Sequence, residues 1–595
     1  MRHHRIYDKI FTYMATQKIS RSMYLKVGLF VILAIFAVSL FSIQIINHDK
    51  YLALAEQMQT SKRTINPVRG QIYTRDKNGE ITPLVLNQTV FTVFADPTQI
   101  NDAEKIRDTI QKNAPDQVIM NNLTDAKLID DNNQYLVLAR QVERSQVDKI
   151  RAENLAGVGF QSTVRRVYPE GNLAAQVLGF VNVDGKGQYG VEQFLNSELA
   201  GKPGLLQSVT DVRRIPLSIG ANDVSIPAQD GMDYILTIDR SIQLQAEQIL
   251  KNGLDKAGSG SGAVLVMNPQ NGQILAMANY PTYNPAEYTE VKNGADFQNS
   301  TVSYAFEPGS VMKTLSTGTA LDKGAITPDT TFHNTGCVKV DDATICNLSR
   351  GVDGQTMTMT EVLQWSLNTG AVWQLQQLGN GDITRDARQI LFDYYTEHYR
   401  FGKKTGIEQF GEAVGTIQPP TTLNGARVVY ANMTFGQGMT VTMTQFAAAF
   451  SAAINGGTYY QPTLIDGTLD RNGREKLNEP KVIKQDVLSA QASNELKQMV
   501  YESRHANNPN AYGGFYTGSK TGTAQVYDPA TGTYSATVTT GTIIGFGADK
   551  EKTPQYVIMV RVDGGERQGS GTGATAQPIF DAMANYINQY EGISR

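Results

Sequence analysis

Residues 262–278, GAVLVMNPQNGQILAMA, contain two apolar runs on either side of a turn. The runs cover 262–267 and 273–278, and each has the length of a β-strand. Between them stands Pro269-Gln270-Asn271-Gly272, whose proline, asparagine and glycine are typical turn formers. The stretch therefore predicts a β-hairpin.

The residues on either side of this hairpin alternate between helical and strand patterns. Residues 241–250 have apolar and polar side chains at helical spacing, and residues 310–460 are mainly helical, with interrupting loops. Strand patterns follow at 516–526, 534–547 and 555–563. A helix is expected at 574–590. A helical middle between antiparallel strands predicts the α+β class, and we expect this domain to span residues 236–595.

The segment before this domain mixes several patterns. Pro67, Gly70 and Asn78-Gly79 mark turns between strands, and residues 102–155 have a helical, charged pattern. Residues 157–235 are rich in glycine and again have patterns typical of strands. We expect an elongated mixed α/β domain over residues 47–235, which we call the membrane-proximal domain.

Residues 27–46 contain no charged side chain. A helix of this length spans about 30 Å, the thickness of a bilayer core. The alternative is a cleaved signal peptide, but its apolar core is normally only about 7–15 residues long. Residues 1–26 carry six Lys and Arg against one acidic residue, Asp8. The positive-inside rule therefore predicts a single-pass plasma-membrane protein with a cytoplasmic tail at 1–26 and its folded domains outside.

Composition excludes several classes of function. The chain has 595 residues with a net charge of −4, which gives no electrostatic support for a nucleic-acid partner. Its two cysteines cannot build a disulfide scaffold or a four-cysteine metal site. None of its six histidines lies in an HExxH motif, which argues against a zinc hydrolase. We expect no metal and no cofactor.

Three short motifs could carry chemistry. They are Ser310-Val311-Met312-Lys313, Ser366-Leu367-Asn368, and Lys520-Thr521-Gly522 followed by Thr523. Each is weak alone: the first could be a helix-capping serine with a solvated lysine, the second a helix end and the third a surface strand. Their order is more specific, with 56 residues between the two serines and 154 from Ser366 to Lys520.

In this order the motifs resemble those of penicilloyl-serine transferases. Residues 262–285 resemble the strand pair that precedes the nucleophile in that family, and FGQG at 435–438 recurs there. Residues 166–180 (RVYPEGNLAAQVLGF) and 190–204 (GVEQFLNSELAGKPG) resemble the membrane-proximal, dimerisation-type domain of class B penicillin-binding proteins. RGQIYTRDKNG at 69–79 is similar to another block of that domain but has inserted residues. The resemblance implies a penicillin-binding transpeptidase fold.

The resemblance implies that Ser310 attacks a D-Ala-D-Ala stem peptide of peptidoglycan and forms an acyl-enzyme, and that β-lactams acylate the same serine. Lys313 is the candidate base. A lysine with its ordinary pKa near 10.4 is protonated at neutral pH, so burial or a second positive charge must lower the pKa of Lys313. Lys520 could supply that charge.

The remaining motif residues receive roles from the same resemblance. Ser366 relays a proton to the leaving amine, and Asn368 hydrogen-bonds both the substrate amide and the base. Thr521 joins Lys520 in holding the substrate carboxylate, and Gly522 lets the substrate lie against the strand. The backbone N–H groups of Ser310 and Thr523 form the oxyanion hole.

Other functions remain open as alternatives. A β-lactamase has related motifs, but the anchor and the large membrane-proximal domain argue against a secreted resistance enzyme. A non-catalytic scaffold or sensor fits poorly with the intact motifs and a tail of only 26 residues. A bifunctional enzyme with a glycosyltransferase is disfavoured because residues 47–235 contain no Glu-Asp dipeptide.

The family implies a glycan polymerase in the membrane and other cell-division proteins as partners. Division-type members usually carry Glu-Pro-Gly-Ser before the nucleophile, as residues 307–310 do here, and an asparagine at the position of Asn368. Elongation-type members often have Pro-Pro-Gly-Ser and an aspartate. The resemblance therefore implies septal cell-wall synthesis, with elongation as the alternative.

Cys337 and Cys346 flank the turn-rich segment VKVDDATI. On the oxidising side of the membrane, a hairpin at these positions could close a disulfide. The alternative is two separately buried thiols.

Overall fold

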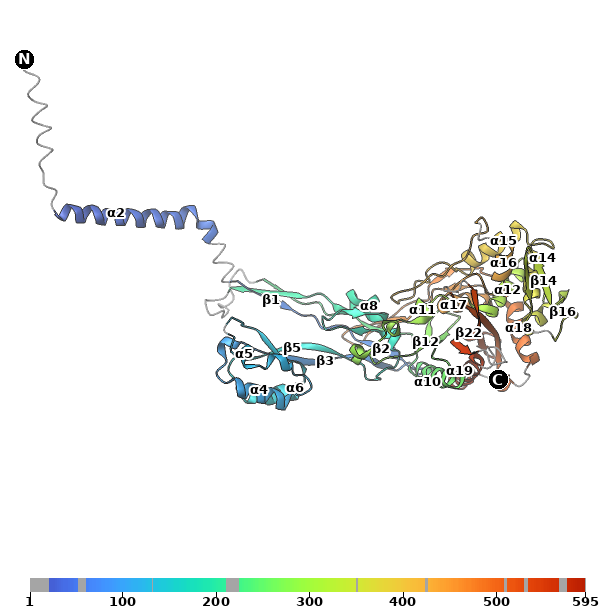
Figure 1. Ribbon diagram of the computed structural model, residues 1–595, viewed down its shortest axis with the longest axis horizontal. Helices are drawn as coiled ribbons and strands as arrows, with labels where there is room; N and C mark the ends of the chain where they lie inside the picture. The colour runs from blue at the N-terminus through green and yellow to red at the C-terminus, as the bar shows by residue number, and fades with distance from the viewer. Residues whose placement is uncertain are drawn as a thin grey trace, which may run out of the picture. The chain divides into compact units, whose positions relative to one another are not determined.

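The computed structural model describes residues 21–51, 60–130, 132–209, 224–348, 351–422, 426–507, 511–528, 533–566 and 575–593 (Figure 1). These residues fall into two compact units. The first unit contains Met1–Pro67 and Lys202–Gln229, and the second contains Val68–Gly201 and Asp230–Arg595.

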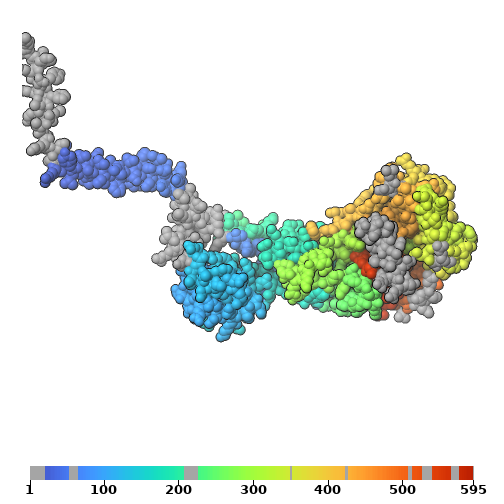
Figure 2. Space-filling model, viewed as in Figure 1, coloured from blue at the N-terminus to red at the C-terminus, as the bar shows by residue number. Residues whose placement is uncertain are grey.

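The first unit carries the apolar N-terminal helix. Helix α2 (Arg21–Phe41) continues into a short π-helical turn, η1 (Ser42–Ile46), and its apolar side chains are exposed along the whole helix (Figure 2). Arg21–Ile46 is long and apolar enough to cross a membrane, and no other such helix occurs among the described residues. It contains the predicted span. The unit also contains an antiparallel sheet of β1 (Thr60–Ile65), β8 (Gly204–Val209) and β9 (Val224–Ile226).

The second unit begins with the rest of the membrane-proximal sequence. Strand β3 (Ile81–Ala95) pairs with β2 (Ile72–Arg75), β4 (Leu136–Val142) and β5 (Val158–Val167). Helices α4 (Ala103–Asn113), α5 (Asp125–Leu128) and α6 (Arg144–Ala152) contribute apolar side chains to the core beside this sheet. Strand β4 lies in a region predicted to be helical, so that part of the prediction was wrong: the alternation in LVLARQV fits a half-buried strand.

A buried charge cluster connects three stretches of the membrane-proximal domain, residues 69–79, 166–180 and 190–204. Glu192 is fully buried and accepts hydrogen bonds from Nε of Arg69 at 2.9 Å and from Nε of Arg166 at 2.8 Å. Loss of one partner from such a cluster leaves a buried charge uncompensated, which typically costs about 3–5 kcal/mol. The cluster therefore joins Arg69 to a residue that lies 123 positions later in the chain.

Strand β10 (Asp233–Leu236) runs parallel to β2 and antiparallel to β18 (Ile465–Leu469). One sheet thus contains strands from both sides of the predicted boundary between residues 235 and 236. The boundary itself stays a prediction.

The larger part of the second unit is built on an antiparallel sheet with the strand order β12-β11-β23-β22-β21. Its strands are β11 (Ser261–Met267), β12 (Ile274–Tyr280), β21 (Tyr516–Asp528), β22 (Thr533–Ala548) and β23 (Pro554–Glu566). The predicted hairpin and the later strands are confirmed. Strand β21 stands at the edge of the sheet.

Helices cover both faces of this sheet, which makes the fold α+β as predicted (Figure 1). Helices α10 (Arg240–Ala257) and α19 (Ala576–Tyr590) share one apolar core with the sheet. On the other face lie α11 (Ser300–Ser303), α17 (Met443–Ile454) and α18 (Ala490–Asn507). Further helices complete this half: α12 (Lys313–Asp322), α13 (Met359–Gln364), α14 (Asn368–Leu378), α15 (Arg385–Asp393) and α16 (Arg427–Met433).

Short strand pairs interrupt the helical region. Strand β13 (Thr331–His333) pairs with β16 (Thr356–Thr358), and β14 (Cys337–Val340) forms a hairpin with β15 (Ala343–Cys346). Cys337 and Cys346 face each other in this hairpin and form a disulfide, as predicted.

Candidate active site

Ser310 lies in a tight turn directly before a buried helix. Residues Gly309–Met312 form a 3₁₀ turn, and α12 starts at Lys313. Ser310 is therefore not the first residue of α12 but lies in the turn, three residues before it. Val311 and Met312 are buried, so the turn is anchored in the core while Ser310 stays partly accessible.

Lys313 is fully buried and brings the first two motifs together. Its Nζ atom lies 2.9 Å from Oγ of Ser310 and 2.7 Å from Oδ1 of Asn368. It also donates to Oγ of Ser366 over 3.2 Å and to the Ser366 carbonyl oxygen over 2.7 Å. Three of the predicted site residues thus surround one amine.

The second motif occupies the connection between α13 and α14. Ser366 adopts the left-handed backbone conformation, with φ at 55°, in the loop between the two helices. Asn368 is the first residue of α14, and its Nδ2 donates to the carbonyl oxygen of Cys346 over 3.0 Å. Sequence analysis did not predict this last contact.

The third motif reaches the same point from strand β21. Nζ of Lys520 donates to Oγ of Ser366 over 3.0 Å and to the Thr521 carbonyl oxygen over 2.9 Å. Lys520 is buried, whereas Thr521 and Thr523 are partly exposed. Ser366 therefore lies between the two lysines, and all three motifs converge.

The two lysines have lowered pKa values. Burial, and in second place the charge of Lys520, holds the pKa of Lys313 well below its ordinary value. Burial lowers the pKa of Lys520 to about 7. Among the described residues no carboxylate forms a salt bridge with either ammonium group. A neutral Lys313 amine beside a serine hydroxyl can accept its proton.

Gly522 allows strand β21 to lie against the nucleophile turn. A Cβ atom at this position would stand 2.4 Å from Oγ1 of Thr542 and 3.0 Å from both the Pro308 carbonyl oxygen and the Val311 nitrogen. Oγ1 of Thr542 also donates to the Pro308 carbonyl oxygen over 2.8 Å. Packing inside the protein therefore requires glycine at position 522. The contact of Gly522 with substrate stays a prediction.

The segment 435–438 supports the same turn from the other side. The N–H of Gly309 donates to the Gly436 carbonyl oxygen over 3.1 Å. Gly436 has φ at 81°, and a Cβ atom there would stand 2.2 Å from the Gly309 carbonyl oxygen. The N–H of Gly438 donates to the Glu307 carboxylate over 2.8 Å. In the sequence, the only sign that these positions matter was that FGQG at 435–438 recurs in the penicilloyl-serine transferases.

Two family models match parts of this chain. The model of the penicillin binding protein transpeptidase domain matches residues 262–585, and that of the penicillin-binding protein dimerisation domain matches residues 64–233.

Curated relatives match over most of the chain. Stage V sporulation protein D of Bacillus subtilis is 30% identical over 544 residues, which cover 90% of this chain and 80% of the relative. Peptidoglycan D,D-transpeptidase FtsI of Escherichia coli is 26% identical over 546 residues, which cover 91% of this chain and 87% of the relative.

The crystal structure of penicillin binding protein 2X from Streptococcus thermophilus has the same fold. It superposes with a TM-score of 0.71 at 24% identity, covering 89% of this chain and 80% of that one. Since the transpeptidase model alone matches more than half of the chain, the chain belongs to the penicillin-binding protein transpeptidase family, and within it to the class B proteins.

Proposed function

We propose that this chain is a peptidoglycan D,D-transpeptidase that works through an acyl-enzyme on Ser310. The observation that carries the proposal is the 2.9 Å distance between Oγ of Ser310 and Nζ of the buried Lys313. A serine hydroxyl is a weak nucleophile unless a base takes its proton, and a lysine can act as that base only with a lowered pKa. The short distance and the lowered pKa of Lys313 both support this role.

In the first half-reaction, Oγ of Ser310 attacks the penultimate D-Ala carbonyl carbon while Lys313 takes the hydroxyl proton. The N–H groups of Ser310 and Thr523 stabilise the oxyanion. The amide bond then breaks, and the departing D-Ala amine receives a proton through Ser366, which contacts both lysines. The product is an ester between Ser310 and the shortened stem peptide.

In the second half-reaction, an amine of a neighbouring stem peptide attacks the ester and loses its proton to Lys313. The new amide cross-links the two peptides, and Ser310 recovers its hydroxyl proton.

Before the first half-reaction, protonated Lys520 and Thr521 hold the terminal carboxylate of the stem peptide, and Asn368 holds the substrate amide. The edge position of β21 supports binding of an extended peptide along that strand. A β-lactam enters the same first step, because its ring amide takes the place of the scissile bond.

We also propose that residues 1–26 lie in the cytoplasm and that the catalytic domain lies on the outer side of the membrane. The apolar helix Arg21–Ile46 supports one crossing, and the basic residues before it support this orientation. A glycan polymerase in the same membrane and cell-division proteins are the proposed partners, because newly made glycan strands must be cross-linked where they emerge.

We place the protein in septal synthesis on the basis of Glu307 and Asn368. Depletion in the host should then give chains or filaments with blocked septa. Swollen, rounded cells that still divide would assign the protein to elongation instead.

The catalytic proposal is tested with the full chain in detergent, a glycan strand bearing D-Ala-D-Ala stem peptides and an acceptor amine. The proposal predicts one D-Ala released for each cross-link formed, and neither product from Ser310→Ala. Ser197→Ala is a matched control, because this exposed serine lies in the membrane-proximal domain. Rapid hydrolysis of a bound penicillin, without cross-linking, would instead identify a β-lactamase.

A further inference from the structure

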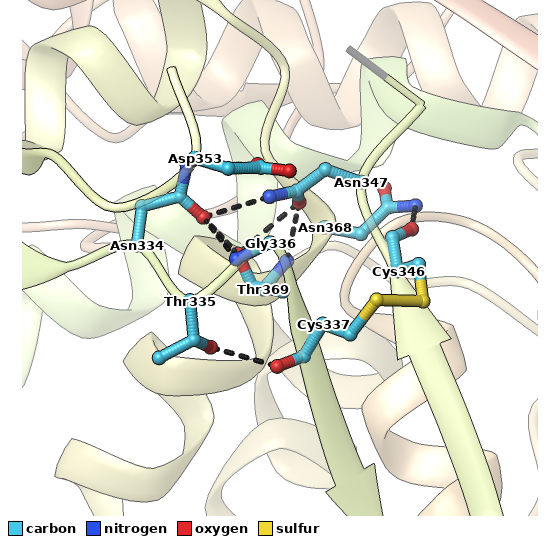
Figure 3. The surroundings of a disulfide bond; sticks show 9 residues. All are labelled: Asn334, Thr335, Gly336, Cys337, Cys346, Asn347, Asp353, Asn368 and Thr369. Carbon is cyan, nitrogen blue, oxygen red and sulfur yellow. Dashed lines mark hydrogen bonds between the residues drawn. A yellow bond between two sulfur atoms is a disulfide. The ribbon is translucent and has the colours of Figure 1, made fainter. Parts of the chain in front are cut away.

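The disulfide hairpin ends at a residue of the active site. Nδ2 of Asn368 donates to the carbonyl oxygen of Cys346 over 3.0 Å (Figure 3). The other end of the same amide, Oδ1, accepts from Nζ of Lys313 over 2.7 Å. One side chain is thus held between the candidate base and the backbone of a disulfide-bonded cysteine, and the position of that carbonyl sets the direction of the amide.

A second connection joins the end of the hairpin to the start of α14. Oδ1 of Asn347 accepts from the N–H of Thr369 over 3.0 Å and from its hydroxyl over 3.1 Å (Figure 3). Nδ2 of Asn347 donates to Oδ1 of Asn334 over 2.8 Å, and Oδ1 of Asn334 also accepts from the N–H of Gly336 over 3.0 Å. Asn334, Asn347 and Thr369 are all buried. The residues next to both cysteines are therefore tied to the residue after Asn368.

The disulfide joins the two strands at the open end of the hairpin. Strands β14 and β15 contain four residues each, and in the part of the chain that the structure describes they pair only with each other. Val340 and Ile345, near the turn, are buried in the main core, whereas Cys337 and Cys346 at the other end are only partly buried. Cys337 and Cys346 face each other at the open end, which is the end that contacts Asn368. The disulfide fixes the hairpin where the active site uses it.

We propose that the Cys337–Cys346 disulfide is a positioning element for Asn368, so that Ser310 is acylated at full rate only when this hairpin is cross-linked. The inference rests on the proposed function, since it concerns the rate of the same acylation. The disulfide touches neither substrate nor the reacting atoms; it acts through the Cys346 carbonyl oxygen and the buried asparagines.

The first test compares wild type with Cys337→Ser/Cys346→Ser as full chains, using the second-order rate of acylation by a fluorescent penicillin. Loss of one well-placed hydrogen bond predicts a rate about tenfold lower. The acid limb of the pH–rate profile should also move to lower pH, because Lys313 loses an acceptor that favours its protonated form. A mere loss of stability would not move that limb.

Asn368→Ala provides the second comparison. If the disulfide acts through Asn368, removing the two cysteines in the Asn368→Ala background changes the remaining rate by less than about twofold, since coupled effects are not additive. An equal tenfold loss in both backgrounds contradicts the proposal, because the disulfide would then act by another route.

Reduction of the disulfide in folded wild type tests the proposal even if the double-cysteine variant misfolds. A water-soluble phosphine and one water molecule convert the disulfide to two thiols and give a phosphine oxide. Reduction should slow acylation of wild type about tenfold, reoxidation should restore it, and Cys337→Ser/Cys346→Ser should not respond. A reduced wild type that acylates at the full rate ends the proposal. Failure of oxidised wild type to be acylated at all would instead reject the proposed function.

Discussion

Lys313 and Lys520 both donate a hydrogen bond to the hydroxyl of Ser366, over 3.2 Å and 3.0 Å. Both lysines are buried, and two ammonium charges at this separation disfavour each other. The arrangement favours one neutral lysine and one charged lysine on either side of a shared serine. Because Lys313 is the lysine beside Ser310, it is suited to the neutral, proton-accepting role, and Lys520 is left to carry the charge.

Lys313→Met should lower the acylation rate by about 10²–10⁴-fold, the usual contribution of general acid–base catalysis. Methionine keeps most of the buried volume, so folding should be affected less than by alanine. The measurement is stopped-flow acylation with a penicillin. Lys323→Met is the control, since this lysine is exposed just after the same helix. A Lys313→Met rate within about tenfold of wild type would exclude Lys313 as the base.

The pH dependence of acylation should be bell-shaped. The rate rises with pH as Lys313 loses its proton, and because the pKa of Lys313 is lowered, this limb lies well below pH 10. The rate falls again as Lys520 loses the charge that binds the substrate carboxylate, starting near its pKa of about 7. A rate that still climbs toward pH 10, as an unperturbed lysine would require, contradicts this assignment.

Lys520→Met should shift the acid limb of that profile to higher pH. The charge of Lys520 lowers the pKa of Lys313, so its removal raises the pKa of the base. The alkaline limb should disappear, and penicillins should bind more weakly through their carboxylate. Lys497→Met, at a half-buried lysine of α18, should leave both limbs in place. An unchanged acid limb in Lys520→Met would show that burial alone sets the pKa of Lys313.

Gly436→Ala should slow acylation strongly while leaving most of the fold intact. The new Cβ atom would meet the carbonyl oxygen of Gly309 at 2.2 Å, so the turn carrying Ser310 must move. Gly402→Ala is a matched control: its φ of 74° imposes a similar backbone strain, but its Cβ would meet no atom within 4 Å. Equal loss of acylation in the two variants would assign the effect to strain rather than to displacement of the turn.

The sequence predicted the elements of the catalytic domain better than their arrangement. The apolar hairpin at 262–278 and the later strands are local patterns, and the structure confirms them. Spacings of 56 and 154 residues do not reveal which atoms meet, so the position of Ser366 between two lysines could be expected only from the family resemblance.

Contacts that involve backbone atoms could not be predicted from the sequence. The Cys346 carbonyl oxygen that holds Asn368 carries no side-chain signal, and asparagines such as Asn334 and Asn347 are far more often ordinary turn residues. The substrate contact predicted for Gly522 also gave an incomplete reason for that glycine, because its nearest atoms belong to the protein's own nucleophile turn.

Covalent labelling shows whether Ser310 is the nucleophile that becomes acylated. The full chain is incubated with a fluorescent penicillin, digested, and the labelled peptide is identified by mass spectrometry. If Ser310 is that nucleophile, we expect one adduct, on the peptide that contains Ser310, and no labelling of Ser310→Ala. Labelling of Ser310→Ala at the wild-type level, or an adduct on another peptide, would contradict it.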